Sequence, residues 1–155
     1  MQITEILADL VAEALKSAQA ASVLPVAGEV DIKIERPKLA EHGDFSTSLP
    51  LTLARTMRVP PIQIATAIVD AMPQDEMIGS VASAPPGFVN FTLSMHWLQS
   101  QVNIVRSLGE KFGAVDSGLG KRVQVEFVSV NPTGPLHVGH ARGAVIGSSL
   151  ANVLE

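Results

Sequence analysis

The stretch covering residues 123–140 constrains the fold of this chain more than any other. It opens with β-branched and aromatic residues, which favour a strand: Val123, Val125, Phe127 and Val128. Residues 131–135 are turn-forming, and from Leu136 the apolar residues recur at helical spacing. The pattern predicts a strand, a Gly/Pro loop and a helix. Such a unit places backbone N–H groups where an open α/β sheet binds anionic nucleotides.

Two histidines mark the start of the predicted helix. His137 and His140 are three residues apart, so both should lie on one side of the first turn. Gly139, between them, leaves room for a base or ribose to approach the backbone. Imidazoles at a helix start can donate hydrogen bonds to phosphate oxygens, and these bonds strengthen as charge develops. The plainer alternative is a pair of ordinary surface histidines.

Composition narrows the possible classes of protein. The 155 residues are 46% hydrophobic and 4% aromatic, which predicts a sizeable aliphatic core. The sequence has no cysteine, which excludes disulfides and thiolate metal sites, and its four histidines form no further cluster, so no metal site is predicted. The net charge of −4 argues against RNA binding by bulk electrostatics and leaves local recognition open.

Targeting and membrane segments are not predicted. The first residues lack the basic and apolar regions of a secretory signal. Residues 77–105 carry no Asp, Glu, Lys or Arg, but Pro85-Pro86-Gly87 and several polar residues interrupt them, which argues against a transmembrane helix. We expect a cytoplasmic protein without membrane contacts.

The order of predicted elements indicates an α+β fold. Helices are expected over 3–18, after 43–46, from 60 and over 94–112, and strands over 30–35, 81–84 and 87–93. Asp44 or Ser46 is expected to cap the second helix, and Ser94 the last. Residues 1–113 should form a domain with a small antiparallel sheet and packed helices, 114–122 a linker, and 123–155 the first β–α unit of a Rossmann-like domain. One strand and one helix bury too little to stand alone, so we expect a piece of a longer chain.

The strand over 87–93 has one purely apolar face. Val89, Phe91 and Leu93 share that face, which should be the core. Phe88 and Asn90 then point outward, although a strand Phe is more often a core residue.

These motifs resemble those of arginyl-tRNA synthetases. His137-Val-Gly-His140 is similar to the HIGH signature of class I aminoacyl-tRNA synthetases, and residues 126–145 are similar to the run around it in the arginine enzymes. Gly43-Asp44-Phe45 and Gly87-Phe-Val-Asn-Phe91 resemble landmarks of their additional N-terminal domain. On this resemblance the chain is identified as an N-terminal part of a member of that family.

The resemblance implies an activity and a set of site residues. The complete enzyme activates arginine with ATP and Mg²⁺ and transfers it to tRNA(Arg). His137 and His140 are implied as catalytic, and with Gly139 as ATP-binding. Arginine binding is implied for Ser129, Asn131 and His140, whereas a turn-forming Asn and a solvated Ser are the plainer interpretation of the first two.

For tRNA, the resemblance implies that Phe88 and Asn90 contact the D-loop. Stacking on an aromatic ring together with an amide hydrogen bond is one way to read an unpaired base. Some members carry Asn where this chain has Pro85, which cannot donate a hydrogen bond, so that part of the contact departs from the family pattern.

Two other functions remain open on the sequence. A nucleotidylyltransferase could use the same H-x-G-H motif, and a non-catalytic RNA-binding module is the most that this piece could be in isolation. We expect the piece to be inactive and to bind no cofactor. It is expected to self-associate through the unpaired edges of the 123–128 strand.

Overall fold

The computed structural model describes residues 3–28, 30–114, 118–131 and 133–154. These form two compact units, Met1–Glu110 and Lys111–Glu155, called here the N-terminal and the C-terminal unit.

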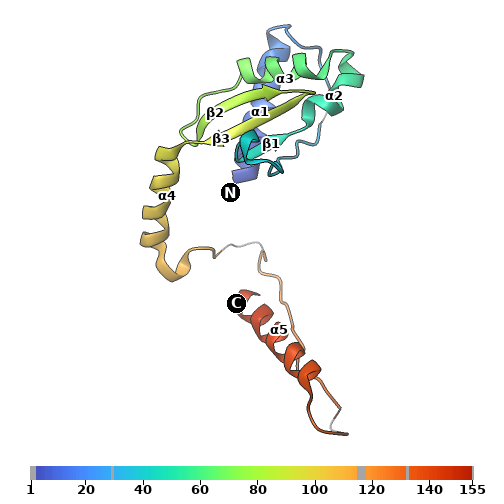
Figure 1. Cartoon of the computed structure of the whole chain (residues 1–155), viewed down its shortest axis with the longest axis vertical. Helices are drawn as coiled ribbons and strands as arrows, with labels where there is room; N and C mark the ends of the chain where they lie inside the picture. Colours follow the sequence, from blue (N-terminus) through green and yellow to red (C-terminus); the bar gives the residue numbers. More distant parts are fainter. Residues whose placement is uncertain (1–2, 29, 115–117, 132, 155) are drawn as a thin grey trace. The chain divides into compact units, whose positions relative to one another are not determined.

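The N-terminal unit is built on a three-stranded antiparallel sheet in the order β1-β3-β2. Its strands are β1 (Phe45–Thr47), β2 (Ile78–Ala84) and β3 (Phe88–Leu93). Helices cover one face of this sheet (Figure 1): α1 (Ile3–Ala20), α2 (Leu49–Met57) and α3 (Pro61–Asp70). Beyond β3 comes α4 (Met95–Leu108), and two short 3₁₀ helices are η1 (Ala40–His42) and η2 (Gly109–Lys111). The predicted α+β class is confirmed for this unit.

The core lies between the sheet and the helices and is mainly aliphatic, as the composition predicts. Its fully buried members come from α1, α3 and β3: Leu7, Val11, Ala14, Ile64, Ala65, Ile68, Val89 and Phe91. The helical stripes predicted for the first three helices all face it.

The central strand shows the predicted alternation. Val89 and Phe91 are 0% exposed, while Phe88 and Asn90 are half-buried on the opposite face. Asn90 lies between Ser46 of β1 and Ala82 of β2, and Phe88 pairs with Ala84 at the hairpin end. The outward placement of Phe88 is therefore confirmed.

The Gly43-Asp44 pair joins β1 to β3. Gly43 has a φ of +85°, and a Cβ there would lie 2.5 Å from the carbonyl oxygen of Phe91. The Asp44 carboxylate accepts the Leu93 N–H at 2.8 Å, and the Asp44 N–H donates to the Phe91 carbonyl, also at 2.8 Å. The expected helix cap is therefore wrong for Asp44, which completes the sheet instead, and for Ser46, which lies within β1.

We expect Gly43→Ala to lower the free energy of unfolding by about 1–3 kcal/mol, because the methyl group would overlap the β3 backbone at an unfavourable φ. Urea denaturation followed by circular dichroism measures this. Gly28→Ala is the matched control, since nothing lies within 4 Å of a Cβ there. Equal urea midpoints for the two variants would contradict the argument.

Residues 30–35 are extended but form no strand. Their side chains alternate between half-buried and exposed, as predicted. Pairing is limited to one bridge, in which Glu35 and Ser46 exchange N–H···O bonds of 2.9 and 2.8 Å. The reason is that β1 is only three residues long and Pro37 has no N–H to continue the ladder.

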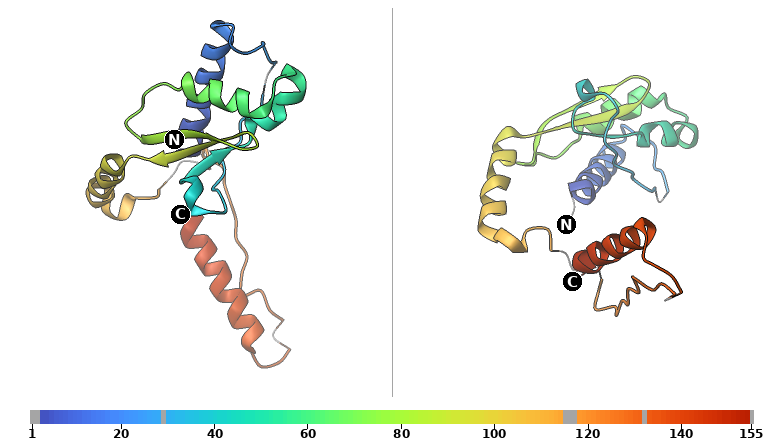
Figure 2. Two further views of the ribbon diagram at one scale, coloured as in Figure 1. Left: turned by 45° about the horizontal axis from the view of Figure 1, so that its top comes forward. Right: turned by 60° about the horizontal axis from the view of Figure 1, so that its bottom comes forward.

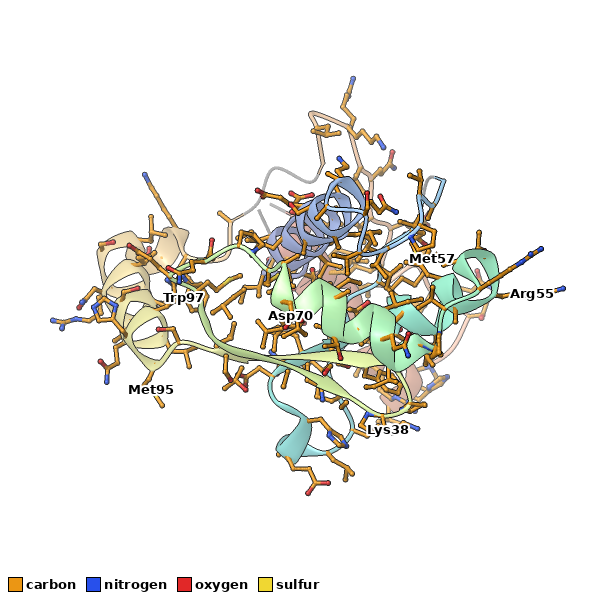
Figure 3. All side chains as sticks on the ribbon, turned by 90° about the horizontal axis from the view of Figure 1, so that it is seen from above. Lys38, Arg55, Met57, Asp70, Met95 and Trp97 are labelled. Carbon is orange, nitrogen blue, oxygen red and sulfur yellow. The ribbon has the colours of Figure 1, made fainter. Side chains whose placement is uncertain are left out.

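Helix α4 begins as predicted but packs differently. The Ser94 hydroxyl accepts the Trp97 N–H at 3.3 Å, which caps the helix. Of its predicted inward residues only Trp97 packs against the core (Figure 3). The prediction is wrong for the others, which are 38–57% exposed: Leu98, Val102, Val105 and Leu108. The helix extends from the end of the sheet rather than across it (Figure 1), so little of its apolar face meets the core.

The C-terminal unit contains α5 (Val138–Leu154) but, among its described residues, no strand. The predicted strand over 123–128 is therefore not formed, and the Rossmann-like β–α unit is not seen. A strand needs partners for its backbone N–H and C=O groups, and Val128, with a φ of +57°, leaves the extended region. The segment instead runs beside α5 (Figure 2), with Phe127 packed against Gly147.

Candidate nucleotide and nucleic-acid sites

The structure brings His137 and His140 together at the start of α5. Their ring centroids are 3.7 Å apart with an interplanar angle of 27°, which is a stacked arrangement. His137 is exposed and His140 half-buried. The sequence-based expectation that both lie on one side of the first turn is met by this geometry.

Each histidine also caps the helix on which the pair sits. The His137 Nδ1 atom accepts the Gly139 N–H at 3.2 Å, and the His140 Nδ1 atom accepts the His137 N–H at 3.3 Å. The pattern is reciprocal like that of a capping box, with imidazoles in place of the usual hydroxyl and carboxylate and with the second rather than the third helical N–H as one donor. A neutral imidazole whose Nδ1 accepts a hydrogen bond carries its proton on Nε2. In their neutral form, both rings would therefore present an Nε2–H donor.

Gly139 lies directly against the His137 ring. A Cβ at this position would lie 2.9 Å from the Cε1 atom of His137. The sequence suggested that this space admits a nucleotide to the backbone, whereas in the structure the His137 ring occupies it. A role of Gly139 in binding ATP stays a prediction.

Ser129 and Asn131 are exposed in the loop that precedes α5. Their side chains form no hydrogen bond to other described residues, and the structure does not join them to the histidine pair. Their role in binding arginine stays a prediction.

A second candidate site lies on the face of the sheet that the helices leave open. Phe88 and Asn90 line a solvent-open cavity of about 380 Å³, which we call the sheet groove. Its remaining lining comes from β1, the β2–β3 hairpin and residues 35–42: Glu35, Arg36, Pro37, Lys38, Leu39, His42, Ser46, Ala84 and Pro85.

Strand register explains why the groove is open at Asn90 and Phe88. Directly paired residues of antiparallel strands point to the same face, so Glu35, Ser46, Asn90 and Ala82 form one row across the sheet. Ser46 and Ala82 flank Asn90, and Ala84 pairs with Phe88. These small neighbours leave the amide and the aromatic ring accessible.

Basic side chains line the groove on one side, and sequence reasoning missed them. Arg36 lies with its Cζ atom 5.4 Å from the centroid of the Phe45 ring, a cation–π arrangement. Lys38 and His42 are exposed and line the same cavity. The sequence did contain a local indication of them, because Arg36 and Lys38 flank Pro37 in a chain whose net charge is −4.

Among the described residues, no three His, Cys, Asp or Glu side chains are grouped so as to hold a metal ion. None of the described helices has the length and apolar character needed to cross a membrane.

Comparison with known proteins gives consistent matches. Residues 5–93 match a family model described as the arginyl tRNA synthetase N terminal domain. An arginine–tRNA ligase of Dehalococcoides mccartyi strain CBDB1 is 42% identical over 155 residues, which is all of this chain and 28% of that relative. The ligase of Nitrosomonas europaea is 46% identical over 135 residues, 87% of this chain and 23% of that relative.

Solved structures agree in fold. The Thermus thermophilus arginyl-tRNA synthetase matches 97% of this chain with a TM-score of 0.55 and 25% identity. The Plasmodium falciparum enzyme matches 96% of this chain with a TM-score of 0.67 and 17% identity. At that identity the match shows a similar fold and nothing more. The chain spans 23–28% of the length of these relatives and structures.

Proposed function

Because the chain belongs to the arginyl-tRNA synthetase family, we propose that it works as the N-terminal part of an enzyme that activates arginine with ATP and joins it to tRNA(Arg). The observation that carries the proposal is the match at 42% identity over the whole chain, which includes both candidate sites. A nucleotidylyltransferase, the enzyme class left open by the H-x-G-H motif, receives no comparable support.

The histidine pair would stabilise the transition state of arginine activation. The arginine carboxylate attacks the α-phosphorus of ATP, a P–O bond to pyrophosphate breaks, and the adenylate forms. The Nε2–H donors of His137 and His140 bind oxygens of the reacting phosphates and stabilise the charge that develops on them, which is electrostatic rather than covalent catalysis. Mg²⁺ accompanying ATP would add positive charge at the phosphates.

Arginine would be held by Ser129 and Asn131. Both are free of hydrogen bonds to other described residues and lie in the loop that leads to the histidines. Their hydroxyl and amide groups suit the α-amino and carboxyl groups of an amino acid. His140 would contribute from the helix side.

The sheet groove would contact the D-loop of tRNA(Arg). The half-buried Phe88 offers a stacking surface and Asn90 an amide beside it, the pairing that suits an unpaired base. Pro85 lines the groove but has no N–H, so it contributes only packing. We place the protein in the cytoplasm, where tRNA is charged.

A chimera tests the proposed function. The chain replaces the aligned portion of the D. mccartyi ligase, and charging of tRNA(Arg) is measured with each amino acid. We expect charging with arginine alone. A folded chimera that charges no arginine would contradict the proposal. The 155-residue chain by itself should show no ATP–pyrophosphate exchange.

Self-association of the isolated chain is a separate expectation. The strand edge that was to mediate it is absent among the described residues, but α5 exposes apolar side chains, with Val145 65%, Ile146 66% and Val153 82% exposed. Leaving these in water is unfavourable, so copies should associate through them. Light scattering of 1–155 against 1–113 tests this. A monomeric longer chain would refute it.

A further inference from the structure

We propose that the basic side of the sheet groove, formed by Arg36 and Lys38 with His42 beside them, binds backbone phosphates of the RNA whose base meets Phe88 and Asn90. The inference rests on the proposed tRNA contact of those two residues and extends it from base reading to backbone binding. The groove then holds a nucleotide by its base and its phosphate together.

The geometry supports a site for a whole nucleotide. The aromatic ring, the amide and the cationic side chains line one cavity of about 380 Å³, within the range of small-molecule sites. Its lining combines residues of the sheet and the β2–β3 hairpin with residues 35–39 and His42. Figure 3 shows Lys38 beside the tip of the β2–β3 hairpin, near the end of the sheet where Phe88 lies.

The charges divide the groove into two parts. Glu35 is the one carboxylate of the lining, and it lies in the same row across the sheet as Asn90. A carboxylate repels phosphate but accepts hydrogen bonds from the amino groups of bases. The sheet residues of the lining therefore suit a base, and the phosphate belongs with Arg36 and Lys38.

Arg36 is positioned before any ligand arrives. Its guanidinium lies 5.4 Å from the centre of the Phe45 ring, and the flat group keeps its N–H edges free for a phosphate. Pro37 restricts the backbone between the two cations. Neither Arg36 nor Lys38 forms a salt bridge with another described residue, whereas Lys33 pairs with Asp31 at 3.7 Å. Both charges therefore remain available to a phosphate.

The experiment measures binding of a tRNA(Arg) transcript to the full 155-residue chain by fluorescence anisotropy at several salt concentrations. The double variant Arg36→Gln/Lys38→Gln should weaken binding about tenfold at low salt. The slope of log K against log salt should fall by about 0.7 for each phosphate contact that is lost. Arg36→Lys/Lys38→Arg keeps the charges and should retain the slope.

Two single variants serve as controls. Arg55→Gln removes a cation that is exposed on α2 and projects away from the groove (Figure 3), so binding should stay unchanged. Phe88→Ala should weaken binding without altering the slope, because it removes a stacking contact and no charge. Melting temperatures of all variants establish that they are folded.

The outcomes separate the inference from the proposed function. If Phe88→Ala weakens binding but the double variant behaves like the unchanged chain, the phosphate contacts are refuted and the base contact stands. An equal loss in Arg55→Gln would overturn the inference, because attraction would then be non-specific. If the chain binds no RNA, or if neither Phe88→Ala nor the double variant has an effect, the groove is not an RNA site and both proposals fail.

Discussion

Replacing His140 with alanine in the full-length synthetase is expected to slow arginyl-adenylate formation by about 10²–10³-fold, the effect of removing one donor to a developing oxyanion. The reason is the placement of its ring at the start of α5, with Nδ1 engaged by the His137 N–H at 3.3 Å and Nε2–H left as a donor. ATP–pyrophosphate exchange in the presence of tRNA measures the rate. The KM for ATP should change far less.

A second variant separates chemistry from helix capping. His140→Gln keeps an acceptor at the third helical position, as in an ordinary capping box, but lacks the imidazole donor. It should be as slow as His140→Ala if the ring acts on phosphate. His96→Ala removes an exposed histidine on α4 and should be neutral. Recovery of full activity in His140→Gln would show that His140 only shapes the helix.

Phe88→Ala in the same enzyme is expected to raise the KM for tRNA with little change in the KM for ATP. Stacking of a base on an aromatic ring contributes about 1–3 kcal/mol, which corresponds to a roughly 5- to 150-fold weaker interaction. The structural reason is the outward face of β3, where Phe88 is half-buried and lines the groove. Aminoacylation at varied tRNA concentrations checks the result.

The neighbouring residue supplies the control. Val89 is fully buried on the opposite face of the strand, so Val89→Ala should lower the melting temperature and leave the KM for tRNA nearly unchanged. If Phe88→Ala instead behaves like Val89→Ala, with lost stability and normal tRNA kinetics, Phe88 is a packing residue and the groove does not stack a base.

Local periodicity was enough to predict the elements that bury one face. Apolar residues recur every three to four positions along α1 and along the two helices that follow β1, and every second position along β3. The same holds for His137 and His140, because a separation of three residues brings two side chains together on any helix. Such features depend on neighbours in the chain and are readable without the tertiary structure.

The tertiary structure decided the features that depend on distant partners. Asp44 binds the N–H of Leu93, 49 residues later, and no local pattern distinguishes that role from a helix cap. The basic residues join the lining of the sheet groove because the segment before Pro37 pairs with Ser46, which brings the stretch that carries Arg36 and Lys38 to the edge of the groove. Residues 123–128 have strand-forming side chains, yet without partner strands their backbone hydrogen bonds have nowhere to go. A sequence determines which residues favour a strand or a helix, but whether a strand or a groove forms depends on what the rest of the fold places beside it.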